Sequence, residues 1–239
     1  MNQTVVDSGG EALVATLRAE LDRLVAGTDE RAAGKALLDG SAGRDLYVSY
    51  LVQTRHYVAL TYPCLSGAGR RMKELGQHDF LADLLFQKAE EEEDHDVLID
   101  NDLRALGLSA EKTLEEQGAG GWITAYNAWI KAATQGRHPA SFLGSAYVLE
   151  GLAVHRAGPS ARALRAKRGI DGIEKATTFL ELHAEADISH VDDMERILGG
   201  LTDPAEQEAI IMTAAATREA YLGMLDELAD AHLKPALHA

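Results

Sequence analysis

Two histidines and an aspartate share one face of a predicted helix over residues 172–198. His183, Asp187 and His190 stand at positions i, i+4 and i+7, in the middle of the stripe of apolar side chains that marks the buried face of this helix. The spacing keeps the three side chains within about 60° of one another around the helix axis. A core histidine satisfied by the aspartate is one interpretation. The pattern favours a divalent metal ion, because one ion binds all three groups and removes the cost of burying the carboxylate.

A second predicted helix, over residues 80–106, repeats this arrangement inside an acidic run. Five adjacent acids, residues 90–94, stand directly before His95. Such a run is usually a solvated helix face. Glu92 and His95 nevertheless fall inside the apolar stripe, whereas Glu91 lies at its edge and the other three acids point elsewhere. Because Glu-x-x-His is the spacing of helix-bundle di-iron carboxylate proteins, we expect His95 and Glu92, or Glu91 in its place, to be metal ligands.

A third predicted helix, over residues 139–157, carries Glu150 at the centre of its apolar face. A protonated buried glutamate, or one paired with Arg156, would also fit this position. Since two other helices carry inward-pointing ligands, we interpret Glu150 as a ligand too. The candidate metal ligands are three carboxylates and three imidazoles: Glu92, His95, Glu150, His183, Asp187 and His190. This mixed set suits two divalent iron or manganese ions, whereas zinc prefers fewer ligands in a closed tetrahedral site.

The elements that must position these residues are all helical. Every long segment has helical periodicity, and none shows sustained strand alternation. The final helix has Asp203 as its N-cap and Pro204 at its first position. We predict one all-α domain over residues 1–239, a multi-helix bundle in which residues 1–9 are disordered. The predicted helices span about residues 10–26, 30–38, 44–72 with a kink at Pro63, 80–106, 110–117, 122–134, 139–158 with a small extra helix to 168, 172–198 and 203–233.

Charge and composition exclude several kinds of partner. The 239-residue chain has 23 Lys and Arg against 38 Asp and Glu, a formal net charge of −15. This balance argues against nucleic acid or an anionic membrane as a partner. The single cysteine, Cys64, excludes an internal disulfide and a cysteine-rich zinc site. No apolar run approaches the ~20 residues of a membrane span and no secretory signal is visible, so we expect a cytoplasmic protein.

The six candidate ligands and their order resemble the heme-oxygenase-like di-iron oxidases, the iron-containing redox enzyme family related to TenA and PqqC. The resemblance covers about residues 44–198, and its most specific element is the histidine–aspartate–histidine pattern. It implies a heme-oxygenase-like (TenA/PqqC-like) bundle without haem, in which these six residues bind two Fe²⁺ ions, or manganese, and O₂ is a co-substrate. A homodimer is compatible with this fold, although no interface signature is visible. The stretches that carry the resemblance are YLVQTRHYVALTYP (50–63), EEEEDHDVLIDNDLRALG (90–107), YVLEG (147–151) and HAEADISHVDDMERIL (183–198).

The activity implied by this resemblance is that of an O₂-dependent non-haem oxidase or oxygenase. Its substrate would be a small amino acid, an amine or a fatty acid, changed by N-oxygenation or oxidative C–C cleavage. Two alternatives remain: a cofactor-independent PqqC/TenA-like enzyme, and a non-catalytic metal-binding helical bundle. Candidate substrate-pocket residues, for which ordinary packing is the alternative, are Thr54, Arg55, Tyr57, Thr61 and Tyr147.

Two other branches of this fold fit the sequence less well. Haem oxygenase needs an axial histidine on an early helix, but the first histidine, His56, lies opposite the apolar stripe of its predicted helix, and we expect it to be solvated. The thiaminase branch needs a nucleophilic cysteine. Cys64 follows Pro63 and is interpreted as a small core residue.

Overall fold

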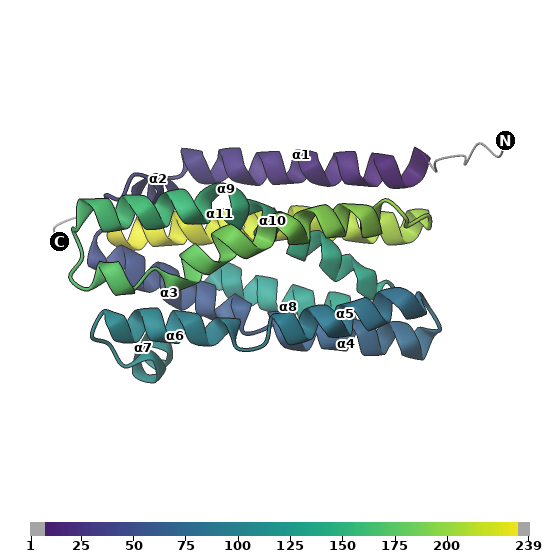
Figure 1. The fold of residues 1–239 in the computed structure, drawn as a ribbon, viewed down its shortest axis with the longest axis horizontal. Helices are drawn as coiled ribbons and strands as arrows, with labels where there is room; N and C mark the ends of the chain where they lie inside the picture. The colour runs from purple at the N-terminus through teal and green to yellow at the C-terminus, as the bar shows by residue number, and fades with distance from the viewer. Residues whose placement is uncertain (1–7, 234–239) are drawn as a thin grey trace.

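The computed structural model describes residues 8–233, except for the side chains of residue 8 and of residues 185–189. The described residues form helices and no strand (Figure 1). The α-helices are α1 (Ser8–Glu30), α2 (Ala32–Leu38), α3 (Arg44–Val58), α4 (Thr61–Leu75), α5 (Asp79–Glu91), α6 (His95–Ala105), α7 (Ala110–Gln117), α8 (Gly121–Gln135), α9 (Phe142–Lys167), α10 (Thr178–Leu198) and α11 (Pro204–His232), with short 3₁₀ helices η1 (Pro139–Ser141) and η2 (Ile173–Lys175).

The helices pack as an elongated bundle in which α9 is the central element. This helix contacts α10, α11, α1 and α2, while α3 packs against α6, α8 and α11, and α4 packs against α5 and α8. The predicted apolar stripes meet in one continuous core, whose fully buried members include Leu17, Leu24, Tyr47, Leu51, Met72, Ile99, Leu103, Val148, Leu198 and Ile210. In the part of the chain that the structure describes, no helix is long and apolar enough to cross a bilayer.

Local signals place several helix ends where the sequence predicts them. α7 has the predicted bounds, and α10 ends directly before Gly199 and Gly200. At the start of α11, the Asp203 carboxylate accepts a hydrogen bond from the Ala205 N–H at 2.9 Å, so the predicted N-cap is confirmed. The expected disorder of residues 1–9 falls mostly on residues 1–7, which lie outside the described residues; residues 8 and 9 already belong to α1.

The prediction of one kinked helix over residues 44–72 is wrong, because the chain forms two helices there. α3 ends at Val58, and α4 begins at Thr61. Pro63 lies in the first turn of α4, where a residue without an N–H leaves no intrahelical hydrogen bond unmade. The proline therefore begins a helix instead of bending one.

The prediction that the helix after Pro139 ends near Pro159 is also wrong. α9 continues through Pro159 to Lys167. A proline inside a helix normally leaves the carbonyl four residues earlier without a donor. Here that carbonyl belongs to His155, and the Arg156 guanidinium donates to it at 3.0 Å. The side chain replaces the missing backbone donor, so the helix can continue.

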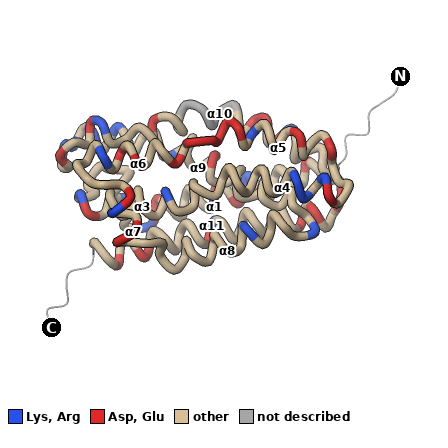
Figure 2. Tube along the Cα trace, turned by 90° about the horizontal axis from the view of Figure 1, so that it is seen from below, with Lys and Arg blue, Asp and Glu red and all other residues tan. Residues whose placement is uncertain are grey.

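The predicted helix over residues 80–106 is interrupted within the acidic run. α5 ends at Glu91 and α6 begins at His95, with Asp94 in the left-handed region at φ 65°. Aspartate is one of the few residues that visit this region, and like charges four residues apart, here Glu90 and Asp94, disfavour a continuous helix. Figure 2 shows the run as a red stretch where α6 meets α5. The Glu-x-x-His motif therefore lies on a turn between two helices instead of on one helix.

Candidate metal centre

Five of the six predicted ligands lie together in two overlapping groups. Glu92, His95 and His183 form one group, and Glu92, Glu150 and His190 form the other. Within each group the atoms that could bind a metal lie within 4.8 Å of one another. Glu92 belongs to both groups, as a carboxylate between two neighbouring metal ions would. The sixth residue, Asp187, has its side chain outside the described residues.

The turn between α5 and α6 aims Glu92 and His95 at the same place. The His95 Nδ1 atom lies 3.0 Å from the Glu92 carboxylate, and both side chains are at least four-fifths buried. Burial raises the pKa of Glu92, but the hydrogen bond with His95 and the electrostatic influence of the nearby imidazoles outweigh it, so that its pKa lies below the usual value. Glu92 is therefore a carboxylate at neutral pH, the form that binds a metal.

Glu150 approaches the same point from the middle of α9. Its Oε2 atom lies 3.5 Å from His190 Nδ1 on α10. This oxygen is buried and has no hydrogen-bond partner among the residues that the structure describes. Burial raises the pKa of Glu150, and the interaction with His190 opposes that shift. Its surroundings thus disfavour the negative charge unless a cation is present.

The orientation of His183 is fixed by the first turn of its own helix. Its Nδ1 lies 2.8 Å from the Phe179 carbonyl, which requires an N–H at Nδ1 and leaves Nε2 as the ligand atom. Burial lowers the pKa of His183, although this hydrogen bond opposes the shift. The neutral imidazole that metals bind is therefore the favoured form. The His183 and His95 rings meet edge to face, with 5.0 Å between their centroids.

A buried carboxylate on α6 fixes the start of α10. Asp102 is fully buried and accepts hydrogen bonds from the Thr178 N–H at 3.0 Å, the Phe179 N–H at 3.1 Å and the Thr178 hydroxyl. α10 consequently begins at Thr178, later than the predicted Gly172. The sequence analysis missed Asp102, yet it lies on the same apolar stripe as Ile99 and Leu103, which is the signal that could have found it.

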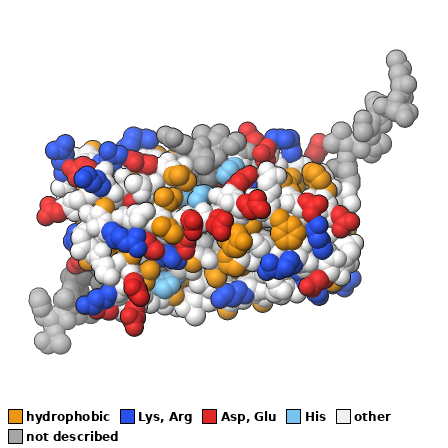
Figure 3. All heavy atoms as spheres, turned by 60° about the horizontal axis from the view of Figure 1, so that its bottom comes forward, with side chains coloured by type: hydrophobic (Ala, Val, Ile, Leu, Met, Phe, Trp, Pro, Cys, Tyr) orange, Lys and Arg blue, Asp and Glu red, His pale blue; other side chains and the backbone are white. Residues whose placement is uncertain are grey.

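The other acids of the run point toward solvent. Glu91 is exposed and pairs with Lys88 at 2.8 Å, and its nearest oxygen lies 3.9 Å from His190 Nε2. Glu90, Glu93 and Asp94 are also exposed. On the face shown in Figure 3, histidine side chains emerge among acidic ones. The geometry thus prefers Glu92 to Glu91 as the shared residue.

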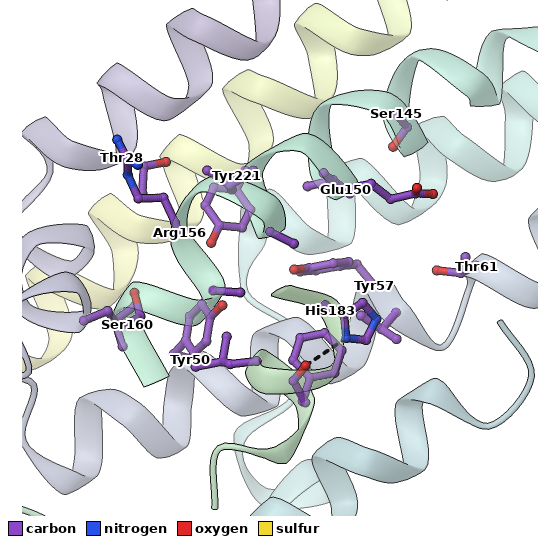
Figure 4. A pocket seen from close by; sticks show the side chains of 18 of the residues that line it. Thr28, Tyr50, Tyr57, Thr61, Ser145, Glu150, Arg156, Ser160, His183 and Tyr221 are labelled. Atoms are coloured by element: carbon purple, nitrogen blue, oxygen red, sulfur yellow. Dashed lines mark hydrogen bonds between the residues drawn. The ribbon is translucent and has the colours of Figure 1, made fainter. Parts of the chain in front are cut away.

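A cavity of about 120 Å³ adjoins these residues and is lined mainly by apolar side chains (Figure 4). Glu92, Glu150 and His183 form part of its wall. Tyr57 and Thr61, two predicted pocket residues, also line it. Further hydroxyl groups come from residues that the sequence analysis missed, chiefly Tyr50, Tyr126 and Tyr221. Tyr50 could have been found, because it shares a helix face with Tyr57 at i and i+7.

Three predicted pocket residues lie outside the cavity lining. Thr54 is fully buried on α3 and does not line the cavity. Arg55 pairs with two aspartates of α6, at 2.8 Å from Asp96 and 2.9 Å from Asp100. Tyr147 is buried on another face of α9, where its hydroxyl donates to Glu195 at 2.7 Å. The ion pairs of Arg55 and the hydrogen bond of Tyr147 give these two residues a structural role.

Two residues considered for other branches of the fold are also placed. Cys64 is buried, as predicted, and burial raises the pKa of its thiol to about 11, which disfavours the nucleophilic thiolate. His56 is half-buried, so the prediction that it is solvated is wrong, and burial lowers its pKa. It does not line the cavity.

Divalent metal ions fit this set of side chains. Two carboxylates and three imidazoles are hard and borderline donors, the combination that iron and manganese accept. A cation would also satisfy the buried Glu150 oxygen that lacks a hydrogen bond among the described residues. His183 already has the outer hydrogen bond that orients a metal-binding imidazole.

Comparison with known proteins agrees with this geometry. A family model described as "iron-containing redox enzyme" matches residues 48–222, well over half of the chain. No curated protein is significantly similar to it in sequence.

Several solved structures share the fold. A domain of unknown function with a heme oxygenase-like fold from Shewanella denitrificans is 17% identical, with a TM-score of 0.78 and 93% of each chain covered. A TenA homologue from Pseudomonas syringae is 15% identical, with a TM-score of 0.73 and 96% of each chain covered. A TenA homologue from P. horikoshii is 13% identical, with a TM-score of 0.72, covering 90% of this chain and 97% of that one. The predicted all-α, heme-oxygenase-like fold is therefore confirmed.

Proposed function

The chain belongs to the iron-containing redox enzyme family, and from this premise we propose that it is an O₂-dependent non-haem di-iron oxidase or oxygenase. Its substrate in this proposal is a small amino acid, an amine or a fatty acid, which undergoes N-oxygenation or oxidative C–C cleavage. The observation that carries the proposal is the position of Glu92, which belongs to two groups of potential ligands at once.

In this proposal the two ions share one carboxylate and have separate histidines. His95 and His183 would hold one ion, Glu150 and His190 the other, and Glu92 both. Asp187, which sequence reasoning adds to the set, would complete it from α10. Two ferrous ions would supply the electrons that activate O₂.

The chain's own residues prepare the reaction space beside the ions. The apolar wall of the cavity excludes bulk water from one side of Glu92, Glu150 and His183. Tyr57 and Thr61 line the same space from the end of α3 and the start of α4. They would position the substrate against the ions, which is the contribution that proximity makes to catalysis.

The proposal is tested by loading the protein with Fe²⁺ under nitrogen and then admitting O₂. Candidate amino acids, amines and fatty acids are included, and O₂ uptake, product and the visible absorption spectrum are followed together. We expect substrate-dependent O₂ uptake that requires iron and is lost in His183→Ala. His155→Ala, which removes an exposed histidine of α9 outside the cavity lining, is the control that should retain this uptake.

Two results would replace the proposal with an alternative. Iron binding without O₂ uptake for any substrate would indicate a non-catalytic metal-binding bundle. Turnover without metal, unchanged in His183→Ala, would indicate a cofactor-independent enzyme of the PqqC or TenA type. The TenA homologues among the structural neighbours make the second worth testing. The buried Cys64 thiol, with its raised pKa, argues against the thiaminase reaction within it.

A further inference from the structure

Three tyrosine hydroxyls meet inside the cavity. Tyr50 and Tyr57 come from α3 and Tyr221 comes from α11, and all three line the same space. Figure 4 shows their hydroxyl groups pointing toward one another, with Glu150 and Thr61 on one side of them and Ser160 on the other. This convergence, here called the tyrosine cluster (Tyr50, Tyr57 and Tyr221), places hydrogen-bonding groups in the middle of an otherwise apolar cavity.

The tyrosine cluster offers donors, and the protein gives them no strong acceptor. Among the described residues, no hydrogen bond joins any of these hydroxyls to a carbonyl or a carboxylate. The groups that influence them are other hydroxyls: Tyr50 is affected by Tyr221 and Thr54, and Tyr57 by Thr54, whose own buried hydroxyl has no hydrogen-bond partner among the described residues. The fourth lining tyrosine, Tyr126, differs because its hydroxyl is paired with the Ser145 hydroxyl at 2.7 Å.

The hydroxyls of the tyrosine cluster remain protonated. Burial raises the pKa of Tyr50, Tyr57 and Tyr221, and the neighbouring tyrosines add to the shift at Tyr57 and Tyr221. They therefore present O–H donors and no negative charge at neutral pH. A cationic ligand group would find no counter-charge among them.

A positive side chain is also near the cavity, but it is already occupied. Arg156 lines the wall, and its guanidinium forms a two-pronged pair with Asp29, with Nε 2.6 Å and Nη2 2.5 Å from the two carboxylate oxygens. Its remaining Nη1 donates to the His155 carbonyl. The tyrosine cluster is thus the place in the described cavity where several uncommitted donors meet.

We propose that the tyrosine cluster binds one oxygen acceptor of the substrate, a carboxylate or a carbonyl group, carried on an apolar body, and disfavours an ammonium group at that point. Several O–H donors aimed at one oxygen can hold it inside an apolar cavity without a cation. The apolar remainder then extends toward Glu150 and Thr61, so the atom that reacts is distant from the acceptor. This inference rests on the proposed function only in assigning the acceptor to a substrate.

Binding measurements under nitrogen test the proposal without turnover. The full-length protein, as isolated and after Fe²⁺ loading, is titrated calorimetrically with octanoate, octanamide and octylamine, which share one chain length. We expect an acceptor ligand, the acid or the amide, to bind at least tenfold more tightly than the amine. Each of the variants Tyr50→Phe, Tyr57→Phe and Tyr221→Phe should lower the affinity for the acceptor ligand by about three- to tenfold, the effect of one lost hydrogen bond.

The matched control is Tyr47→Phe. Tyr47 is a buried tyrosine of α3 whose hydroxyl donates to the Ala176 carbonyl at 2.6 Å and which does not line the cavity. Its removal should leave the ratio of acceptor to amine affinity unchanged. Because this ratio is measured within each variant, a general loss of stability does not imitate the expected result.

Three outcomes would overturn the inference: no binding of either acceptor ligand, equal or tighter binding of the amine, or an unchanged ratio in all three cluster variants. These outcomes are separate from the test of the proposed function. If the protein prefers acceptor ligands but does not consume O₂, the inference about the tyrosine cluster stands and the proposed activity fails. If it consumes O₂ but does not prefer acceptor ligands, the proposed activity stands and this inference fails.

Discussion

A single position in the acidic run separates the candidate chemistry from ordinary surface charge. Glu92 turns inward, while its neighbours Glu91 and Glu93 are exposed. Sequence periodicity could predict this difference because Glu92 falls on the apolar stripe of the predicted helix. It could not predict that Glu92 would belong to two ligand groups, since that depends on how α9 and α10 approach the turn.

Tyr147 illustrates a residue whose type suggests a pocket and whose contacts indicate stability. Its buried hydroxyl donates to Glu195, which also binds Arg18. We expect Tyr147→Phe to lower the free energy of unfolding by about 1.5–3 kcal/mol, the contribution of a hydrogen bond to a charged group. Chemical denaturation measures this change. The affinity for ligands of the cavity should stay the same in this variant.

The pH dependence of this effect has a definite sign. The hydrogen bond with Arg18, together with that from Tyr147, lowers the pKa of Glu195 in the folded protein. A carboxyl with a lowered folded pKa adds stability above its unfolded pKa, about 4.3, and that stability is lost as the pH falls through the folded value. The difference between wild type and Tyr147→Phe should therefore shrink below about pH 4. A difference that grows on acidification would contradict this assignment.

At the scale of elements, the break between α5 and α6 is the feature that aims the motif. Asp94 has φ 65°, a conformation that glycine adopts without strain and alanine does not. We expect Asp94→Ala to lower the unfolding free energy by about 1 kcal/mol and Asp94→Gly to leave it nearly unchanged. Thermal or urea denaturation shows which of the two variants is the more stable. In a continuous helix the order would be reversed, with alanine the better residue.

Asp102 connects two elements that carry candidate histidine ligands. It lies on α6, which begins at His95, and it binds the first turn of α10, whose Phe179 carbonyl orients His183. We expect Asp102→Ala to lower the unfolding free energy by about 2–3 kcal/mol and to weaken Fe²⁺ binding about tenfold. Calorimetry and anaerobic metal titration measure the two effects. Asn101→Ala, an exposed neighbour, is the control, and equal metal affinity in both variants would refute the link.

Element ends could be predicted from sequence only where local chemistry decides them. The Asp203 cap and the glycines after α10 are local signals, and the structure follows them. Pro159 misleads because a sequence pattern does not show which side chain can replace the N–H that proline lacks. In the structure, Arg156 donates to the His155 carbonyl in its place. The break at Asp94 is not predicted from periodicity either, because the apolar stripe of the predicted helix over residues 80–106 continues on both sides of it.

At the scale of the whole molecule, packing alone creates the cavity. Helical periodicity is sufficient to predict an all-α bundle and the inward direction of the five candidate ligands whose side chains are described. The meeting of Tyr50 with Tyr221 joins residues that are far apart in the chain, on α3 and α11. No spacing rule within one helix predicts such a convergence, and the same reason explains why Thr54 and Tyr147 could not be separated from true lining residues.

The proposed function requires two metal ions around Glu92, and the amount of iron that the protein binds can be counted. Anaerobic equilibrium dialysis against Fe²⁺, followed by metal analysis, should give two ions per chain for the wild type and fewer than one for Glu92→Ala. Glu93→Ala, which removes an exposed acid one residue away, should retain both ions. A wild-type protein that binds no iron, or a Glu92→Ala variant that binds as much as the wild type, would contradict the account.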